Sequence, residues 1–150
     1  MGHTYHSLSF HIVFSTKERL PIIDSTMCDR LHAYMAGIIN NGYGFTRKIN
    51  GTTDHVHILA DIKPTYSPSD LLREIKANSS RWTHETFSPK ANFAWQSGFG
   101  IFSVSFSLVP KVIHYIENQE KHHRNMTFQE EYLELLQRHN VHYDSRYIWD

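Results

Sequence analysis

Two histidines separated by one residue stand out as side chains that could do chemistry. They form His55-Val56-His57, inside a segment whose β-branched and apolar residues predict a strand over 53–62. Alternate residues of a strand point to the same face, so both imidazoles project together while Val56 points to the other side. Paired imidazoles on a rigid strand can begin a metal site. Such a pair is also often a hydrogen-bonded polar face, so the motif alone leaves both interpretations open.

A second spacing joins Tyr115 to Gln119, four residues later. Residues four apart on a helix are neighbours on one face. An apolar stripe at helical spacing predicts such a helix and is formed by Val109, Val112, Ile113 and Ile116. The tyrosine and the glutamine lie on the flank of this stripe, where a functional pair would be presented. The pattern alone favours a plainer interpretation, in which the tyrosine ring packs at the core edge and the glutamine is solvated.

The elements that must position these residues alternate between strands and helices. Strands are predicted over 5–14, 44–49, 53–62, 93–95 and 101–105. Helices are predicted after Asp24, at Ser67-Pro68, over 109–116 and after Thr127. Asn50-Gly51 predicts a hairpin turn between the two central strands. This order indicates an α+β fold in which an antiparallel sheet carries helices on one face.

The bulk composition suits one domain spanning residues 1–150. With 40% hydrophobic residues the chain can build a core. No apolar run is long enough to cross a bilayer and no secretion signal is evident, so we expect no membrane association. The single cysteine, Cys28, allows no internal disulfide and fits a cytoplasmic protein. A formal net charge of zero argues against coating duplex DNA but permits a short single-stranded contact.

Several segments, taken together, resemble one protein family. DHVHIL, IKANSSRW, WQSGFG and VIHYIENQ occur in this order, and the resemblance runs from about His6 to Trp149. The chain is similar to the single-tyrosine HUH transposases of small bacterial insertion sequences, the IS200-like family, where HUH means histidine, hydrophobic residue, histidine. The joint order is specific, whereas each segment alone is not. One departure is GFG at residues 98–100, where family members tend to carry GYG.

The resemblance implies a role for each of the spaced residues. Tyr115 matches the nucleophile, and His55, His57 and Gln119 match the ligands of a divalent metal ion, Mg²⁺ or Mn²⁺. The implied fold is ferredoxin-like. The implied enzyme is a metal-dependent tyrosine transposase that cleaves and rejoins single-stranded DNA through a covalent 5′-phosphotyrosine, at element ends with a hairpin nearby. It also implies a homodimer in which the tyrosine helix of one subunit faces the histidines of the other.

The ligand types suit this reaction. Two neutral imidazoles and one amide oxygen leave the ion's positive charge available for the scissile phosphate. A tyrosine hydroxyl, with an ordinary pKa near 10, needs such help to act as a nucleophile. Imidazoles by themselves favour Zn²⁺ or Mn²⁺, so the assignment of Mg²⁺ or Mn²⁺ depends on the resemblance.

Basic residues on two predicted elements are candidates for contacting DNA. They are Arg47, Lys48, Arg73, Lys76 and Arg81. Charge on a helix face is more often ordinary solvation, so the pattern leaves both interpretations open.

Two other functions compete with the transposase. One is a non-catalytic nucleic-acid-binding module, a domesticated relative of the same fold. The other is a metal-dependent hydrolase that activates water, for which Asp54 and Asp61 are the nearest candidate bases. Asp54 could instead orient a histidine or serve the turn that precedes it.

Overall fold

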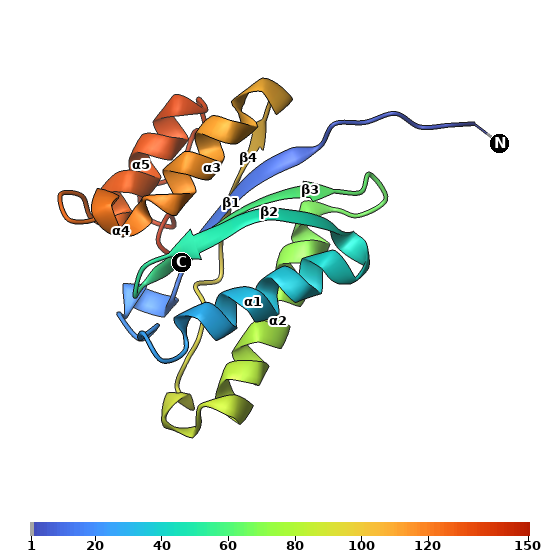
Figure 1. Cartoon of the computed structure of the whole chain (residues 1–150). Helices are drawn as coiled ribbons and strands as arrows, with labels where there is room; N and C mark the ends of the chain where they lie inside the picture. The colour runs from blue at the N-terminus through green and yellow to red at the C-terminus, as the bar shows by residue number, and fades with distance from the viewer. Residues whose placement is uncertain (1) are drawn as a thin grey trace.

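A four-stranded antiparallel sheet lies between two layers of helices (Figure 1). The computed structural model describes residues 2–150. The strands are β1 (Ser9–Ser15), β2 (Gly44–Gly51), β3 (His55–Ile62) and β4 (Gly100–Val104), ordered β2-β3-β1-β4 in the sheet. The α-helices are α1 (Cys28–Ile38), α2 (Pro68–Thr86), α3 (Val109–Glu117), α4 (Gln119–His122) and α5 (Phe128–Arg138). This order, with α1 and α2 as the crossing helices, is the predicted ferredoxin-like α+β fold.

Two helices begin where their capping residues predict. The Ser67 hydroxyl accepts a hydrogen bond from the Asp70 amide at 3.1 Å, and α2 follows at once with Pro68. The Thr127 hydroxyl accepts one from the Glu130 amide at 3.2 Å, and α5 follows. Each cap satisfies an amide that the first helical turn leaves without a partner.

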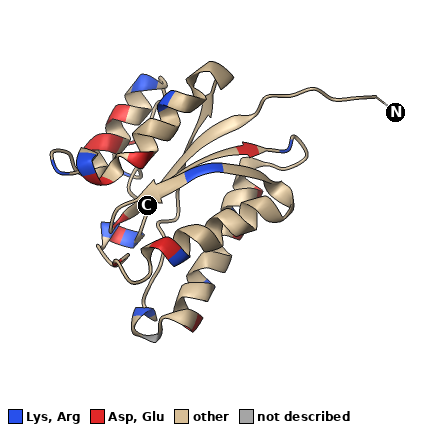
Figure 2. Ribbon diagram, in the orientation of Figure 1, with Lys and Arg blue, Asp and Glu red and all other residues tan. Residues whose placement is uncertain are grey.

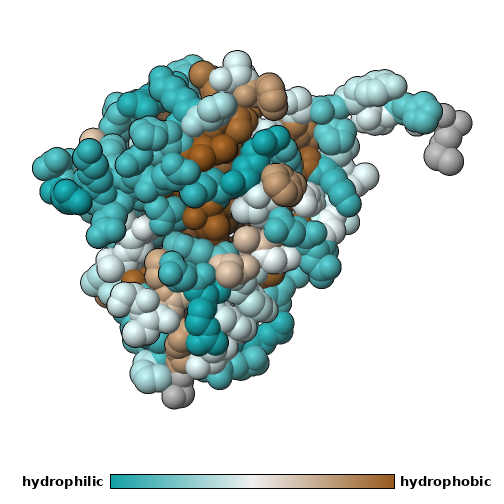
Figure 3. Space-filling model, in the orientation of Figure 1, coloured by the Kyte–Doolittle hydropathy of each residue, from teal (hydrophilic) through white to brown (hydrophobic). Residues whose placement is uncertain are grey.

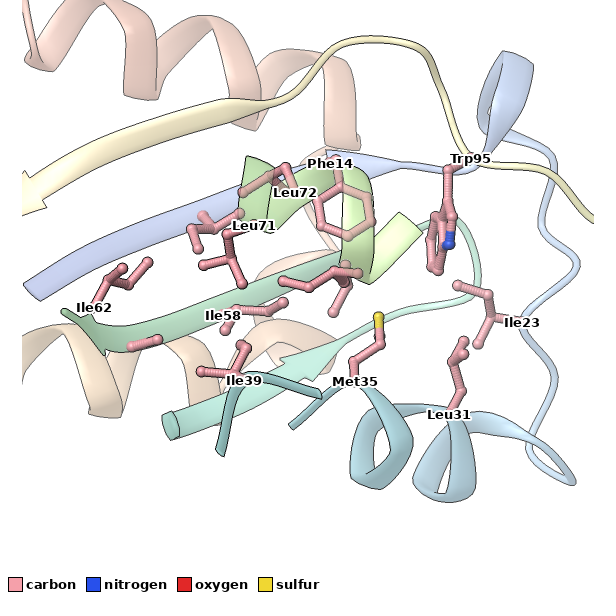
Figure 4. Close-up of a cluster of buried hydrophobic side chains, with 14 of the residues drawn as sticks. Phe14, Ile23, Leu31, Met35, Ile39, Ile58, Ile62, Leu71, Leu72 and Trp95 are labelled. Atoms are coloured by element: carbon pink, nitrogen blue, oxygen red, sulfur yellow. The ribbon is translucent and has the colours of Figure 1, made fainter. Parts of the chain in front are cut away.

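The face of the sheet covered by α1 and α2 holds the larger apolar core (Figure 4). Alternate side chains of β1 and β3 enter it, among them Phe14 and Ile58, which are fully buried. The Phe14 ring meets the Trp95 ring edge to face, with centroids 4.9 Å apart. Helix residues such as Leu31, Met35, Leu71 and Leu72 close the core from the other side. Removal of this apolar area from water is the main force that holds the layer together.

Helices α3, α4 and α5 cover the opposite face of the sheet (Figure 1). Val13 and Phe102 pack there against α5, and Leu59 packs there against Ile116 of α3. The prediction placed helices on one face only, so this second layer is an addition to it. Helices α3 to α5 bury the polar side chains of the central strands, among them His55 and His57.

Two local predictions differ from the structure. Asn50 and Gly51 remain in β2, opposite His57 and Val56, and the turn occupies residues 52–54. A Cβ atom at Gly51 would lie 2.2 Å from the carbonyl oxygen of His55, so only glycine allows β2 to run this close to β3. Of the predicted strand over 93–95, the structure keeps one isolated bridge, between Thr16 and Trp95.

The surface seen in Figure 3 is mostly hydrophilic, with apolar atoms showing in the middle, where the α3–α5 layer meets the sheet. Among residues 2–150, none of the helices combines the length and the apolar character that a membrane crossing needs.

Candidate active site

The strands present three histidines to the face that α3, α4 and α5 cover. His55 and His57 on β3 are fully buried, while Val56 between them enters the larger core. His11 on the neighbouring strand β1 shares their face, and its Nε2 lies 2.7 Å from Nδ1 of His57. The predicted alternation along β3 is therefore confirmed, and two paired strands fix the imidazoles in place.

Tyr115 and Gln119 reach these histidines in their own chain. Oε1 of Gln119 lies 3.1 Å from Nε2 of His55, and the Tyr115 ring meets the His57 ring edge to face with centroids 5.8 Å apart. The two residues do not share one continuous helix, because α3 ends at Glu117 and Gln119 begins α4. The interpretation of Gln119 as solvated is wrong, since its side chain is fully buried.

Two residues that the sequence analysis missed complete the cluster. They are His123, directly after α4, and Glu131 on α5. Oε1 of Glu131 lies 2.8 Å from Nε2 of His57, 3.0 Å from Nε2 of His123 and 3.4 Å from Nε2 of His55. Its Oε2 accepts hydrogen bonds from the Tyr115 hydroxyl and, at 3.1 Å, from Nε2 of Gln119. Nε2 of His122 lies 3.6 Å from Oε2 as well, so one buried carboxylate contacts the tyrosine, the glutamine and four histidines.

A sequence signal for Glu131 did exist. It lies on the buried stripe of α5, between apolar residues that include Phe128, Tyr132 and Leu135. A carboxylate in such a stripe is costly to bury unless it is paired or binds a cation. His123 carries no comparable signal, because nothing in the pattern distinguishes it from His122.

The pKa values of the groups in the cluster are shifted in opposite directions. Burial lowers the pKa of His55, but hydrogen bonds to Asp54 and Glu131 outweigh it and raise that pKa to about 9. Burial lowers the pKa of His57 to about 4 despite the nearby carboxylate. Burial would raise the pKa of Glu131, yet its histidine neighbours hold it below the ordinary value. Burial and Glu131 raise the pKa of Tyr115 above 10. Among protein groups alone, Glu131 is therefore anionic and Tyr115 is protonated.

The tautomers of two histidines show that the donor set fits a metal ion. Nδ1 of His55 lies 2.7 Å from the Asp54 carboxylate, and Nδ1 of His123 lies 2.6 Å from the carbonyl oxygen of Met126. Both oxygens only accept, so each neutral ring carries its proton on Nδ1 and turns the Nε2 lone pair into the cluster. There Nε2 of each ring faces oxygen atoms of Gln119 and Glu131. In the metal-free protein the raised pKa of His55 keeps a proton on its Nε2, and a bound ion would take the place of that proton.

Asp54 therefore orients His55, which was one of its two expected roles. It serves the turn as well, because the same oxygen accepts a hydrogen bond from the Thr52 hydroxyl at 3.0 Å. Asp61 lies elsewhere, paired with Arg47 at 2.7 Å and bonded to the Ser9 hydroxyl. Both candidate bases of the hydrolase hypothesis are thus engaged in other contacts.

Tyr115 borders open space on two sides. One cavity of about 580 Å³ is lined by Lys111, His114, Tyr115, Asn118, Lys121, His122, Asn125 and Met126. A second, of about 210 Å³, lies between α3, α5 and β4 and also includes Tyr115 and Lys111. The tyrosine is therefore reachable from outside, although the metal-ligand candidates behind it are buried.

The predicted DNA-contacting residues do not gather on one surface. Lys48 on β2 pairs with Glu117 of α3 at 3.3 Å, beside the site. Arg73, Lys76 and Arg81 lie on α2, across the sheet from the histidines. Lys76 donates to the carbonyl oxygens of residues 96, 97 and 98, and Arg73 pairs with Asp70. Lys and Arg are interspersed with Asp and Glu over the ribbon rather than concentrated on it (Figure 2).

The antiparallel ferredoxin-like sheet, the buried histidine pair and the nearby tyrosine agree with the resemblance to the single-tyrosine transposases. The family described as IS200-like transposases matches residues 4–119, and this chain belongs to that family. No curated protein matches it.

Two solved structures share the fold. One is a protein from Deinococcus radiodurans R1 assigned as a transposase, with 22% identity over 79% of this chain and 96% of that chain, and a TM-score of 0.63. The other is a REP-associated tyrosine transposase bound to a REP hairpin, with 15% identity over 82% of this chain and 74% of that chain, and a TM-score of 0.59.

Proposed function

We propose that this protein is a metal-dependent transposase that cleaves and rejoins single-stranded DNA at insertion-sequence ends, with residues 1–150 as one catalytic domain. The observation that carries the proposal is the convergence of Tyr115, His55, His57 and Gln119 on one buried cluster beside an open cavity. Membership of the IS200-like family supports transposition as the reaction.

Tyr115 is the proposed nucleophile. Its hydroxyl oxygen forms a bond to the scissile phosphorus, and the bond from phosphorus to the 3′ oxygen of the adjacent nucleotide breaks. The hydroxyl proton leaves by way of Oε2 of Glu131, which already accepts its hydrogen bond, and passes to solvent, while the leaving oxygen takes a proton from solvent water to become a free 3′ hydroxyl. The resulting 5′-phosphotyrosine keeps a phosphodiester linkage, so the 3′ hydroxyl of a second strand can displace Tyr115 and rejoin the DNA without ATP.

His55, His57 and Gln119 would hold a divalent ion, Mg²⁺ or Mn²⁺, which polarises the phosphate and offsets charge on the leaving oxygen. Asp54 and His11 orient the imidazoles from behind, through their contacts with Nδ1 of His55 and Nδ1 of His57. Because burial and Glu131 raise the pKa of Tyr115, its attack depends on this activation.

The proposed substrate is single-stranded DNA with a hairpin near the element end. The REP hairpin bound by a relative of the same fold supports this choice. Lys111, Lys121 and His122 line the larger cavity beside Tyr115, where a phosphodiester backbone would approach. Of the basic residues predicted from sequence, Lys48 lies nearest to this layer, and a contact with DNA at Arg47, Arg73, Lys76 or Arg81 stays a prediction.

A homodimer with a shared site also stays a prediction. Tyr115 lies against the histidines of its own chain, so one chain holds every group that the proposed reaction needs. A shared site would require α3 and α4 to leave their own sheet and dock on that of a partner.

The test is covalent capture of labelled single-stranded DNA that carries a hairpin, in the presence of Mn²⁺. The protein should form an adduct that survives denaturing electrophoresis, and Tyr115→Phe should abolish the adduct while retaining DNA binding. Tyr147→Phe is the matched control, because Tyr147 is exposed in the C-terminal segment, and it should react as the parent does.

Each other outcome favours a different function. An adduct with Tyr115→Phe would mean that another residue is the nucleophile. A free 5′ phosphate without an adduct would favour the water-activating hydrolase. Binding without any cleavage would favour the non-catalytic, domesticated module.

A further inference from the structure

Two of the polar residues in the buried cluster lie beyond residue 119, where the match to the family ends. They are His123 and Glu131. We propose that both bind the metal ion directly, so that this protein holds its ion with three histidines and a carboxylate in addition to Gln119. The inference rests on the proposed function, which puts an ion at His55 and His57, and it adds ligands from α5 and from the end of α4.

The distances suit a common ion. The ligand atoms of His55, His57, His123 and Glu131 all lie within 4.8 Å of one another. The three Nε2 atoms lie 2.8, 3.0 and 3.4 Å from Oε1 of Glu131. Ligands about 2.1 Å from one ion are separated by roughly 3 to 4.2 Å, depending on the angle between them. The cluster therefore needs only small side-chain shifts to coordinate an ion.

The hydrogen-bond directions select His123 as well as His55. Each ring has Nδ1 committed to an oxygen outside the cluster, Asp54 for one and the Met126 carbonyl for the other. Each therefore turns Nε2 inward, which is the arrangement of a metal-binding imidazole whose other nitrogen is oriented from behind.

Glu131 places a buried carboxylate where the imidazoles converge. Its side chain is 1% exposed, on a helix whose stripe is otherwise apolar. Packing of α5 against Val13 and Phe102 fixes the carboxylate in the cluster. A buried carboxylate is costly unless a cation offsets its charge, and a divalent ion among these atoms would offset that charge and bind the three imidazoles at once.

This ligand set has a consequence for metal choice. Oxygen ligands suit Mg²⁺, whereas imidazoles favour the divalent transition metals. Three imidazoles in place of two should make the protein prefer Mn²⁺ or Co²⁺ over Mg²⁺, and the negative charge of Glu131 should strengthen binding of either. The C-terminal helix thereby becomes part of the metal centre.

The experiment is calorimetric titration of the metal-stripped full-length protein with Mn²⁺ and, separately, with Mg²⁺. We expect one Mn²⁺ site in the parent, with weaker binding of Mg²⁺. Loss of an outer contact to a metal ligand lowers affinity about 10- to 100-fold, so Glu131→Gln and His123→Asn should each weaken Mn²⁺ binding by at least about tenfold. Glu134→Gln, one turn further along α5 and paired with Arg138 at the surface, is the matched control and should bind as the parent does.

A spectrum separates a ligand from a residue that only supports the fold. In the Co²⁺-loaded protein, the visible absorption bands should change in position or intensity with Glu131→Gln and His123→Asn but not with Glu134→Gln. If Glu131→Gln does not fold, Glu131→Asp keeps the carboxylate but shortens its reach and should weaken Mn²⁺ binding with circular dichroism unchanged.

The titrations distinguish failure of the two added ligands from failure of the proposed metal site. Parent-like affinity and spectra in Glu131→Gln and His123→Asn, with binding lost in His55→Ala, would overturn this inference and leave the proposed metal site intact. A parent that binds no ion would overturn both.

Discussion

The two faces of the sheet are built from the same strands and bury opposite kinds of residue. On the α1–α2 side, β3 contributes Val56 and Ile58 to an apolar core. On the α3–α5 side, it contributes His55 and His57 to a cluster that is equally buried but polar. The first face supplies stability through apolar burial, and this permits the second to hold groups whose burial is costly by itself. Substitutions on the first face should therefore change stability, whereas substitutions that reach the second should change metal binding.

The largest expected effect is on the apolar face. Phe14→Ala removes a fully buried ring from between the sheet and α2, and large-to-small changes of this kind cost about 3 to 5 kcal/mol. Urea unfolding followed by circular dichroism should therefore show a marked fall in the midpoint.

Phe106→Ala is the matched control, because Phe106 is 68% exposed and its removal should change stability by less than about 0.5 kcal/mol. Equal losses in the two variants would mean that the α1–α2 face is not the main source of stability.

A smaller effect, of about 3 kcal/mol, is expected from pH at His32 on α1. Burial lowers the pKa of His32 from 6.5 to about 4. The folded chain thus keeps His32 neutral where the unfolded chain binds a proton. Its contribution is fully present above pH 6.5 and is lost as the pH falls from 6.5 through 4.

Replacement by leucine removes this proton linkage. His32→Leu should lose less stability than the parent between pH 7 and pH 4.5, as measured by urea unfolding at each pH. His142→Leu is the control, because it removes an exposed histidine from the C-terminal segment, and it should keep the parent's dependence. A His32→Leu protein with the parent's full pH dependence would place the linkage in other groups.

Much of the fold could be predicted because local signals and packing agree. The caps at Ser67 and Thr127, the alternation along β3 and the stripe from Val109 to Ile116 each depend on nearby residues. The second helical layer could not be predicted in this way. The polar positions of β1 and β3 follow the pattern of a solvated face, and only the folded chain brings α5 over them.

The site residues also fall into those that local spacing predicts and those that only the folded chain brings together. His55 and His57 are two residues apart, so strand periodicity predicts that they share a face. Tyr115 and Gln119 were predicted to be neighbours because they lie four residues apart on one helix. The structure interrupts that helix at Asn118, yet both side chains still reach the cluster. Glu131 and His123 contact β3 only through tertiary structure. Glu131 lies 74 to 76 residues from the two histidines in sequence and His123 lies 66 to 68 residues from them, and no local periodicity connects such positions.

The smallest effects, and the sharpest test of the comparison, come from the two helix caps. Ser67→Ala and Thr127→Ala each remove a hydroxyl that accepts an amide hydrogen bond, and each should cost about 1 kcal/mol of unfolding free energy. Only Thr127 begins the helix that carries Glu131, whose amide bonds to the Thr127 carbonyl oxygen at 3.0 Å. If Glu131 binds the ion, Thr127→Ala should weaken Mn²⁺ binding, by at most about fivefold, since 1 kcal/mol corresponds to that factor.

Ser67→Ala is the control and should leave Mn²⁺ affinity unchanged, because α2 lies across the sheet. Equal affinities in the two variants, measured by the same titration, would mean that the first turn of α5 does not hold the carboxylate in place.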